Sequence, residues 1–309
     1  MTKHILTATL LLLLATVAAA QEFSLHWISS PQPDSTSQLW FRKQIVKSGR
    51  PKKAYVCIAT TGYAELYVNG RNVSRNIMTP YREAFTSHTA AATYDVTRFI
   101  HSDTITLSVW YSPSYPHLTD KQISAVFYGI CGDGTPFSYF SDRSWLCRQA
   151  PAYFNSKGGE TIDGRQDKTL WKSNSGYSLA LWTGCESVAT SGSDWTQQAE
   201  QTVSTIGEVI NYRYFDIEKD TITYDFDKGL HGWLRITLRN AIRGGRIFFG
   251  NMEYICNGKL DEQACMRFTA EYIRKPVVYG DRRFKPGHIT NAEGISIVTR
   301  HPTGWQPYY

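Results

Sequence analysis

The chain has 309 residues, of which 42% are hydrophobic, 14% aromatic and 19% charged, and its formal net charge is +6. This length suits one large domain or two of ordinary size. The basic residues are scattered, apart from one dense cluster at residues 239–246 (RNAIRGGR). The composition therefore excludes a nucleic-acid-binding protein, which would concentrate them on one face.

The first twenty residues have the pattern of a secretory signal peptide. Lys3 and His4 precede an apolar run at residues 10–17, and small residues follow up to Ala20. A basic start, a short apolar core and small residues at the exit are typical of such a segment. The alternative is an uncleaved membrane anchor. We favour the signal peptide, because the apolar run is short for a membrane-spanning helix. We predict cleavage after Ala20, a secreted or periplasmic protein, and no membrane span.

Short runs of alternating hydrophobic and polar residues follow, each bounded by Gly, Pro, Asn, Asp or Ser. Such runs are typical of antiparallel strands. In the first part of the chain they lie at residues 54–61, 64–70, 104–111, 123–130, 138–141 and 177–184. Asn69-Gly70 follows one of them directly. Since these two residue types readily take the positive φ angles of a type I′ turn, we predict a tight hairpin there.

A new series of strands is predicted after a polar stretch at residues 197–210. The runs lie at residues 221–226, 232–240 and 246–255. In the middle run Leu234, Ile236 and Leu238 share one face, which predicts a strand with one buried side. We therefore predict an all-β fold of two antiparallel β-sandwich domains, at residues 21–201 and 206–309, the second with an aromatic C-terminal tail.

The cysteines leave the disulfide state open. Their even number in an exported protein permits disulfides, in any of fifteen complete pairings. No CxxC pair and no Cys/His cluster with zinc spacing occurs. We favour structural or free thiols over metal or catalytic roles. The six residues are Cys57, Cys131, Cys147, Cys185, Cys256 and Cys265.

Several short motifs occur in one order along residues 40–272. They are the hairpin at residues 65–70, Pro80-Tyr81, YDVT at residues 94–97, Trp110-Tyr111, GETIDGR at residues 159–165, Trp171, YDF at residues 224–226, Gly232-Trp233, Glu253 and Gly258. In this order they resemble the N-terminal β-sandwich domains of bacterial α-L-rhamnosidases of glycoside hydrolase family 78. Gly164 stands where the family pattern has alanine.

The resemblance implies jelly-roll sandwiches of the galactose-binding and concanavalin-like kinds. In the family an (α/α)₆ barrel follows them and carries the catalytic carboxylates. This sequence has no helical repeat on which those residues could be placed. The resemblance therefore implies the accessory part of a rhamnosidase. We predict a non-catalytic protein that binds carbohydrate, including glycans that contain rhamnose, and that assists partner glycoside hydrolases in polysaccharide or glycan breakdown.

Candidate sugar contacts lie in two segments. Aromatic rings stack on the apolar faces of pyranoses, while carboxylates and arginine hydrogen-bond to their hydroxyl groups. The loop WYSPSYPH and the motif GETIDGR supply both kinds of side chain, and two prolines stiffen the loop. Trp40, Trp182 and Trp233 are expected to pack in the core. The predicted contacts are Trp110, Tyr111, Tyr115, His117, Glu160, Asp163 and Arg165.

Two other functions stay open. A compact glycoside hydrolase with its site between the domains would need two carboxyl groups at about 5 Å, or at about 6.5–9.5 Å. Glu160 with Asp163, or Asp225 with Asp227, would be the pairs to test, although turn caps are the simpler interpretation. The third function is a structural scaffold without ligand. We predict no cofactor, with calcium at residues 65–76 as the alternative because asparagine and glutamate oxygens surround the hairpin.

Overall fold

The computed structural model describes residues 26–31, 34–47, 49–81, 90–114, 121–166, 169–174, 178, 180–189, 196–197 and 202–301. The predicted signal peptide and most of the C-terminal tail lie outside these residues. Strands make up most of the described part, and the short helices are 3₁₀ turns: η2 (Thr97–Phe99), η3 (Leu170–Lys172) and η4 (Pro286–His288). The prediction of an all-β fold is confirmed.

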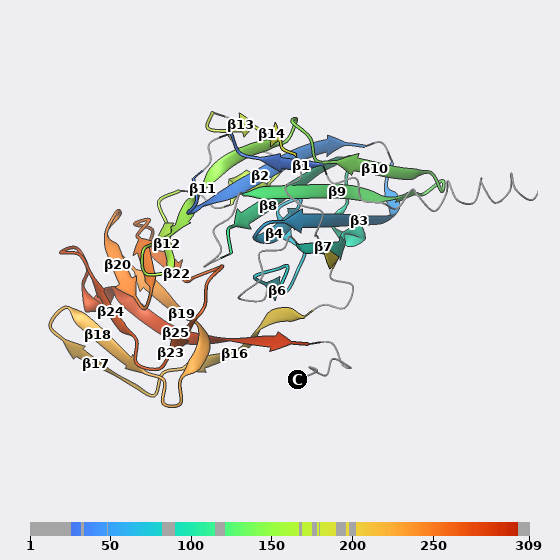
Figure 1. The fold of residues 1–309 in the computed structure, drawn as a ribbon. Coiled ribbons are helices and arrows are strands. Elements are labelled where there is room, and N and C mark those ends of the chain that lie inside the picture. The colour runs from blue at the N-terminus through green and yellow to red at the C-terminus, as the bar shows by residue number, and fades with distance from the viewer. Residues whose placement is uncertain are drawn as a thin grey trace, which may run out of the picture.

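Two sheets form the first sandwich (Figure 1). Sheet A has the order β14 (Glu186–Ser187), β1 (Trp27–Ser29), β9 (Gln122–Cys131), β3 (Pro51–Thr60), β7 (Ala90–Asp95) and β15 (Thr196–Gln197), with β10 (Pro136–Phe140) on β9. Facing it is one half of sheet B, in the order β12 (Glu160–Asp163), β11 (Leu146–Phe154), β2 (Ser37–Val46), β8 (Thr104–Ser112), β4 (Tyr63–Val68) and β5 (Arg71–Asn72), with β13 (Thr183–Gly184) on β11.

The second sandwich contains the other half of sheet B and a sheet C. Sheet B continues from β12 through β21 (Met252–Ile255), β20 (Arg246–Phe249), β24 (Val277–Gly280), β18 (Thr221–Asp225) and β17 (Tyr214–Glu218). Sheet C has the order β22 (Asp261–Ala264), β19 (Leu230–Arg239), β25 (Ile289–Arg300), β16 (Val203–Asn211) and β6 (Asn76–Ile77), with β23 (Glu271–Ile273) on β19.

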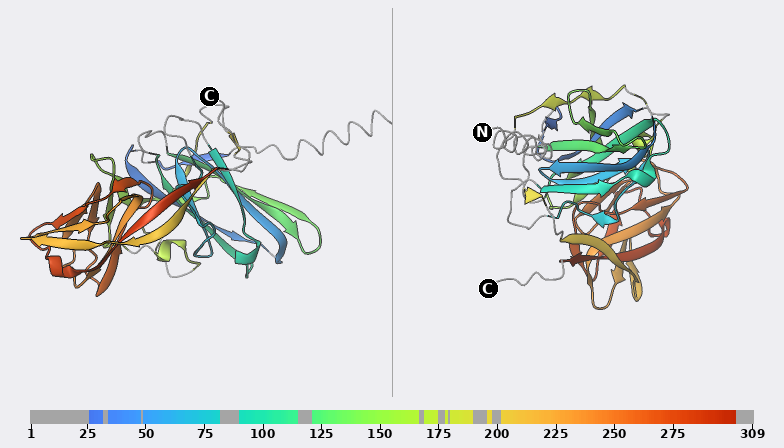
Figure 2. Two further views of the ribbon diagram at one scale, coloured as in Figure 1. Left: turned by 90° about the horizontal axis from the view of Figure 1, so that it is seen from below. Right: turned by 90° about the vertical axis from the view of Figure 1, so that its right-hand side faces the viewer.

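The two sandwiches share a sheet and a core. Strand β12 pairs in parallel with β21, with Ile162 opposite Tyr254, so sheet B runs without a break from one sandwich to the other. Figure 2 shows the two groups of strands side by side in both views. One buried cluster includes Trp40, Trp110 and Trp171 of the first group and residues such as Leu234 of the second. The predicted boundary between residues 201 and 206 stays a prediction, since strands on either side of it pair.

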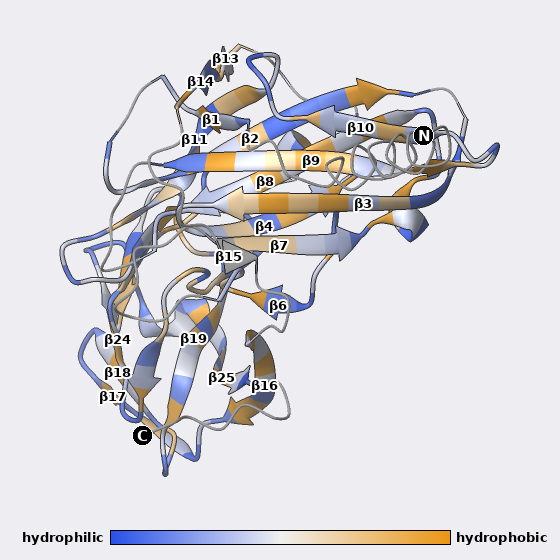
Figure 3. Cartoon of the chain, turned by 45° about the vertical axis from the view of Figure 1, so that its right-hand side comes forward, coloured by the Kyte–Doolittle hydropathy of each residue, from blue (hydrophilic) through white to orange (hydrophobic). Residues whose placement is uncertain are grey.

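Local features of the sequence are confirmed. Strands β4 and β5 form the predicted hairpin, and Asn69 and Gly70 have φ angles of 50° and 83°. In β19, Leu234, Ile236 and Leu238 are buried, as the alternation requires. Figure 3 shows hydrophobic residues along β3, β8 and β9 as well, and β3 and β9 are buried over much of their length. Within the described residues no helix is long and apolar enough to cross a membrane.

The strand predicted at residues 177–184 is wrong. Among the described residues of this run, 178 and 180–184, only Thr183–Gly184 form a strand, β13, which pairs with Leu146 and Cys147 of β11. Ala180 and Leu181 are in a turn, and Leu181 is exposed. An alternating pattern can be satisfied by a turn that lays one hydrophobic side chain on a neighbouring surface, and Trp182 does so here by packing, half-buried, against the shared core.

Candidate functional site

Glu160, a predicted sugar contact, is completely buried and joins the two sandwiches. Its Oε1 atom accepts hydrogen bonds from the backbone N–H groups of Arg267, Phe268 and Thr269 at 2.8, 2.6 and 2.9 Å, and from Thr269 Oγ1 at 3.0 Å. Its Oε2 atom accepts one from Gln38 Nε2 at 2.9 Å. Because both oxygens are occupied and the residue has no exposed surface, Glu160 has a structural role in this fold.

The aromatic residues predicted from the loop WYSPSYPH divide into two groups. Trp110 and Tyr111 point into the core, with 2% and 0% of their surface exposed. Trp110 Nε1 donates to Gln38 Oε1 at 2.7 Å, and the Tyr111 hydroxyl lies 2.8 Å from Thr61 Oγ1. Neither ring has an exposed face on which a sugar could stack in this arrangement. Tyr115 and His117 lie outside the described residues and stay predictions.

Arg267 covers the buried Trp110 from the second sandwich. Its guanidinium lies 4.3 Å from the centre of the Trp110 ring, within cation–π range. Its Nη1 atom also lies 2.5 Å from Glu65 Oε2, and Tyr67 donates to the same carboxyl group at 2.6 Å. Glu65, one of the residues considered for calcium, is therefore occupied by an ion pair between the two sandwiches.

Asp163 and Arg165 form an ion pair at the end of β12. Arg165 donates to Asp163 through Nε at 2.9 Å and through Nη2 at 2.8 Å. The two side chains line different cavities: Asp163 belongs to a groove along β11, and Arg165 to a pocket beside β20 and β21. Of the three residues predicted from GETIDGR, these two are therefore at candidate binding surfaces.

The groove has a volume of about 730 Å³, within the range of small-molecule sites. Its floor follows a bulge in β11: Gln149 pairs with Leu39 and Tyr153 with Ser37, so three residues of β11 face one of β2. Pro151, inside this interval, has no N–H to donate to a ladder, and proline in a sheet is confined to edges and bulges. The bulge therefore turns local side chains toward the cavity.

Aromatic and polar side chains line the groove together. Tyr153 is 43% exposed, and Trp182, which also lines the groove, is half-buried. Rings that are partly exposed beside hydrogen-bonding groups provide the two kinds of contact that a pyranose needs. The sequence predicted that Trp182 packs in the core, and it does pack, half-buried, against the shared core while it also lines the groove. Tyr153 was not among the predicted contacts. The polar lining residues are Asp34, Gln149, Asp163 and Gln166, together with Arg148.

The carboxylate of Asp34 at the rim is held by four groups. It accepts hydrogen bonds from the backbone N–H groups of Thr36 and Ser37, from the Ser37 hydroxyl and from Lys121 Nζ at 2.8 Å. Burial alone would raise the pKa of Asp34, but the hydrogen bonds from Lys121 and Ser37 outweigh it and lower the pKa to about 2.

We expect Asp34 to stabilise the fold fully above about pH 4 and progressively less below it. An unfolded aspartate titrates near 3.8, so the stabilisation is complete above that value and is lost as the pH falls through about 2. Asp34→Asn should lower the urea midpoint of unfolding at pH 5 and should leave it equal to that of the unmodified chain near pH 2. A difference between the two chains that does not change with pH would contradict this.

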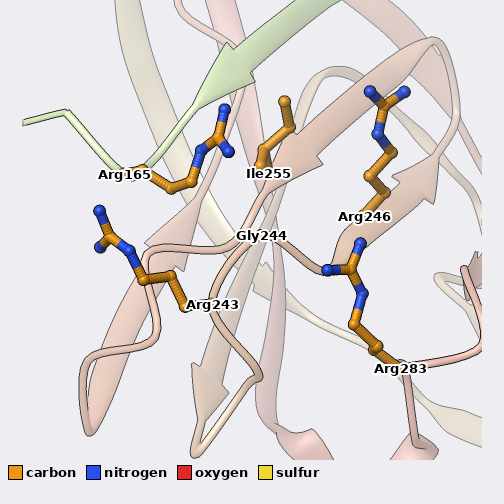
Figure 4. A pocket seen from close by; sticks show the side chains of 6 residues that line it. All are labelled: Arg165, Arg243, Gly244, Arg246, Ile255 and Arg283. Atoms are coloured by element: carbon orange, nitrogen blue, oxygen red, sulfur yellow. The ribbon is translucent and has the colours of Figure 1, made fainter.

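The second cavity, the arginine pocket, has a volume of about 460 Å³. It is lined by Arg165, Arg243, Gly244, Arg246, Ile255 and Arg283 (Figure 4). The figure shows the four arginine side chains arranged around the Gly244 turn. No acidic side chain of the described residues lines it, so the surface that it presents is basic.

Gly164 brings the β12 turn against β21. A Cβ atom at this position would lie 2.3 Å from the Tyr254 hydroxyl oxygen and 2.7 Å from the Ile255 carbonyl oxygen. Gly164 N–H donates to that same carbonyl at 2.8 Å. An alanine, as in the family pattern, would force Tyr254 or the β12 turn to move. The close approach of Gly164 to Ile255 also sets Arg165 beside Ile255 in the arginine pocket.

Gly164→Ala is therefore expected to lower the free energy of unfolding by about 1–3 kcal/mol, the usual cost of overpacking. Gly132→Ala is the matched control, because its nearest contact would be an ordinary 3.9 Å from the Arg50 carbonyl. Urea denaturation followed by circular dichroism measures both. Equal stability of the two variants would show that the turn moves freely.

Comparison with known proteins identifies the family. The profile of the alpha-L-rhamnosidase N-terminal domain matches residues 49–207, which include β11, β12 and most of the groove. The chain belongs to this family. As a rhamnosidase N-terminal domain, it has its groove and the Asp163–Arg165 pair inside the matched region.

The relatives are longer proteins. An alpha-L-rhamnosidase of Formosa agariphila is 22% identical over 291 residues, which cover 81% of this chain and 30% of the relative. The alpha-L-rhamnosidase structure from Dictyoglumus thermophilum matches with a TM-score of 0.78 at 21% identity, over 90% of this chain and 36% of that one. The Streptomyces avermitilis enzyme, determined with L-rhamnose, matches with a TM-score of 0.77 at 18% identity, over 87% of this chain and 29% of that one.

The carboxyl pairs considered for glycoside hydrolysis have other partners. Glu160 is buried in its network, and Asp163 is paired with Arg165. Asp225 accepts a hydrogen bond from the backbone N–H of Asp227 at 2.7 Å and lies 3.1 Å from Lys275 Nζ. Because β18 ends at Asp225 and Asp227 has a φ of 57°, the second pair is a turn cap.

Metal ligands do not gather in the described residues. No group of three or more His, Cys, Asp or Glu among them could hold a metal ion. Asn69 donates to the Phe99 carbonyl and accepts from Thr106 N–H, both at 2.9 Å. Asn72 accepts from Ser74 N–H. Asn69, Asn72 and Glu65, three of the side chains considered for calcium, are therefore engaged by other groups of the chain.

Proposed function

We propose that this rhamnosidase N-terminal domain binds carbohydrate in the groove along β11 and has no catalytic activity of its own. The observation that carries the proposal is the groove itself, which sets Tyr153 and Trp182 among hydrogen-bonding side chains. Rhamnose-containing glycans are the first ligands to test, because the relatives are alpha-L-rhamnosidases and one was determined with L-rhamnose. In this role the protein would hold substrate near partner glycoside hydrolases.

Isothermal titration of the purified chain with rhamnose-containing oligosaccharides tests the proposal. Tyr153→Ala should weaken binding about tenfold or more, since loss of about 1.4 kcal/mol of ring contact is a factor of ten. The matched control is Tyr139→Ala. Tyr139 lies on β10 in sheet A, is exposed to a similar extent (37%), and does not line the groove. Equal weakening by both variants, or no binding at all, would overturn the groove as the site.

The same samples decide between binding and hydrolysis. After each titration, chromatography of the sugar should show it intact. Released rhamnose would contradict the non-catalytic function and would direct attention to carboxyl groups other than Glu160, Asp163, Asp225 and Asp227.

We further propose that the protein is exported, with residues 1–20 removed after Ala20. The sequence pattern of the segment supports this. The mass of the chain recovered from the periplasm or medium of its host should correspond to a start at Gln21. Recovery of the full chain with the membranes would contradict it.

A further inference from the structure

Four arginines reach the arginine pocket from separate parts of the chain. Arg165 follows β12, Arg243 and Arg246 flank the Gly244 turn, and Arg283 follows β24. Bringing like charges together costs free energy in the absence of a counter-charge. Hydrogen bonds from Arg283 to Asp281 raise the pKa of Arg283, while burial and, to the least extent, repulsion from Arg165 oppose the rise.

The carboxylates nearby leave part of each guanidinium free. Asp163 and Asp281 each occupy Nε and Nη2 of their own arginine, so Nη1 of Arg165 and Nη1 of Arg283 donate to no acceptor in the described residues. Arg246 gives one hydrogen bond to Glu253, and Arg243 donates to the Asn257 carbonyl at 2.9 Å. Three acids thus face four arginines, and none of the three lines the cavity.

Gly244 keeps the floor of the pocket open. Its φ of 78° is in the left-handed region, and a Cβ atom there would lie 3.4 Å from Arg283 Nη1. Guanidinium donors from both sides of the turn can therefore approach one small ligand group together. Planar arginine forks match the two oxygens of a carboxylate and the oxygens of a sulfate group.

We propose that the arginine pocket binds the anionic group of an acidic saccharide, the carboxylate of a uronic acid. This inference rests on the proposed function and names its ligand class. The Asp163–Arg165 ion pair has one member in each cavity, so the groove and the pocket adjoin at this pair. A glycan lying in the groove can extend a charged sugar into the pocket.

Titration with an oligogalacturonate tests the inference. The double variant Arg243→Gln/Arg246→Gln removes two pocket arginines whose partners do not line the groove. It should weaken binding of the oligogalacturonate at least tenfold and should leave a neutral rhamnose oligosaccharide bound as before. Arg239→Gln is the matched control. Arg239 belongs to the same basic cluster of the sequence, but it pairs with Asp261 between β19 and β22 and does not line the pocket. Affinity for the acidic ligand should also fall as sodium chloride rises.

Five outcomes separate the possibilities. If Arg239→Gln weakened oligogalacturonate binding as much as the double variant does, general surface charge would account for the binding and the site would be overturned. Binding of inorganic sulfate but of no saccharide would overturn it as well. Binding of a sulfated oligosaccharide in place of the oligogalacturonate would overturn the assignment to a uronic acid. Tyr153→Ala, tested with the neutral sugar, reports on the groove separately. Unchanged neutral binding would mean that the groove proposal fails. Weakened neutral binding, together with acidic binding that the arginine double variant leaves unchanged, would mean that only the pocket proposal fails.

A second inference concerns Cys147 and Cys185, which carry thiols in the structure. Cys147 lies opposite Thr183 in the β11–β13 pair, and Cys185 N–H donates to the Trp145 carbonyl at 2.9 Å, so the two cysteines are diagonal neighbours on one face. Cys147 Sγ also lies 3.9 Å from the Gly184 carbonyl oxygen. Both are buried, and the neighbouring Cys185 side chain lowers the pKa of the Cys147 thiol.

We infer that Cys147 and Cys185 form a disulfide when the chain is exposed to an oxidant such as oxidised glutathione. The two thiols lose two protons and two electrons, and the glutathione disulfide is reduced to two thiols. This bond would tie the segment that carries Trp182 and Thr183 to β11, and so would hold one wall of the groove.

Peptide mapping without reduction tests this on the unmodified chain. After incubation with oxidised glutathione and alkylation of the remaining thiols in denaturant, the peptides that contain Cys147 and Cys185 should be recovered linked, whereas Cys57 and Cys256 should be alkylated. Alkylation of both Cys147 and Cys185, or linkage of either to another cysteine, would overturn the inference.

Discussion

Replacing the buried Glu160 by alanine is expected to lower the free energy of unfolding by about 3–5 kcal/mol. The change leaves the backbone donors of Arg267, Phe268 and Thr269 without their acceptor, and an unsatisfied buried donor costs about 1–3 kcal/mol. Because these donors belong to the second sandwich, the loss also loosens its attachment to β12.

Two controls isolate this effect. Glu160→Gln keeps an oxygen toward the three donors and should cost less than the alanine variant. Glu253→Ala removes a neighbouring glutamate on β21 whose partners are Thr161 Oγ1 at 3.2 Å and the exposed Arg246, and should cost under about 1 kcal/mol. Urea denaturation followed by circular dichroism measures all three. A cost of Glu160→Ala no larger than that of Glu253→Ala would show that the buried network is not what joins the sandwiches.

Trp171→Ala is expected to cost about 3–5 kcal/mol, as truncation of a buried aromatic residue usually does. Its ring stacks on Trp40 with centroids 4.7 Å apart and planes at 5°, and it meets the edges of Tyr67 and Trp110 at 5.5 and 6.1 Å. Removing it opens a cavity in the cluster that both sandwiches share.

Leu170→Ala is the control for this prediction. Leu170 precedes Trp171 in the same 3₁₀ turn but is 44% exposed, so its truncation should change stability by less than about 0.5 kcal/mol. Far-ultraviolet circular dichroism in urea reports both without depending on tryptophan fluorescence. An equally small change in the free energy of unfolding for both variants would contradict the prediction. It would mean that neighbouring side chains move into the cavity left by Trp171.

Features encoded within a few residues could be predicted from the sequence. Asn69 and Gly70 specify their hairpin because few other residues tolerate two successive positive φ angles. The alternation in β19 specifies which side of that strand is buried, since side chains in a strand point to opposite faces in turn. The order of the short motifs along the chain also predicts the rhamnosidase N-terminal domain, and the match of residues 49–207 to the family profile confirms it.

The site depended on contacts between distant residues. Glu160 was predicted as a sugar contact because a carboxylate in a motif is chemically suited to that role. Only the parallel pairing of β12 with β21 buries it against residues more than one hundred positions away. Tyr153 and the position of Trp182 at the groove were missed for the corresponding reason: a ring becomes a surface contact or a core contact according to what packs beside it.

The sequence by itself therefore determined the all-β class, the local turns and the buried face of the strands, because these follow from backbone preferences and from a two-residue period. The tertiary structure alone decided which carboxylates are buried, which rings face a groove, which arginines meet around Gly244 and which cysteines are neighbours. Each of these depends on strand pairings between residues far apart in the chain, and the period of a strand carries no information about its partner.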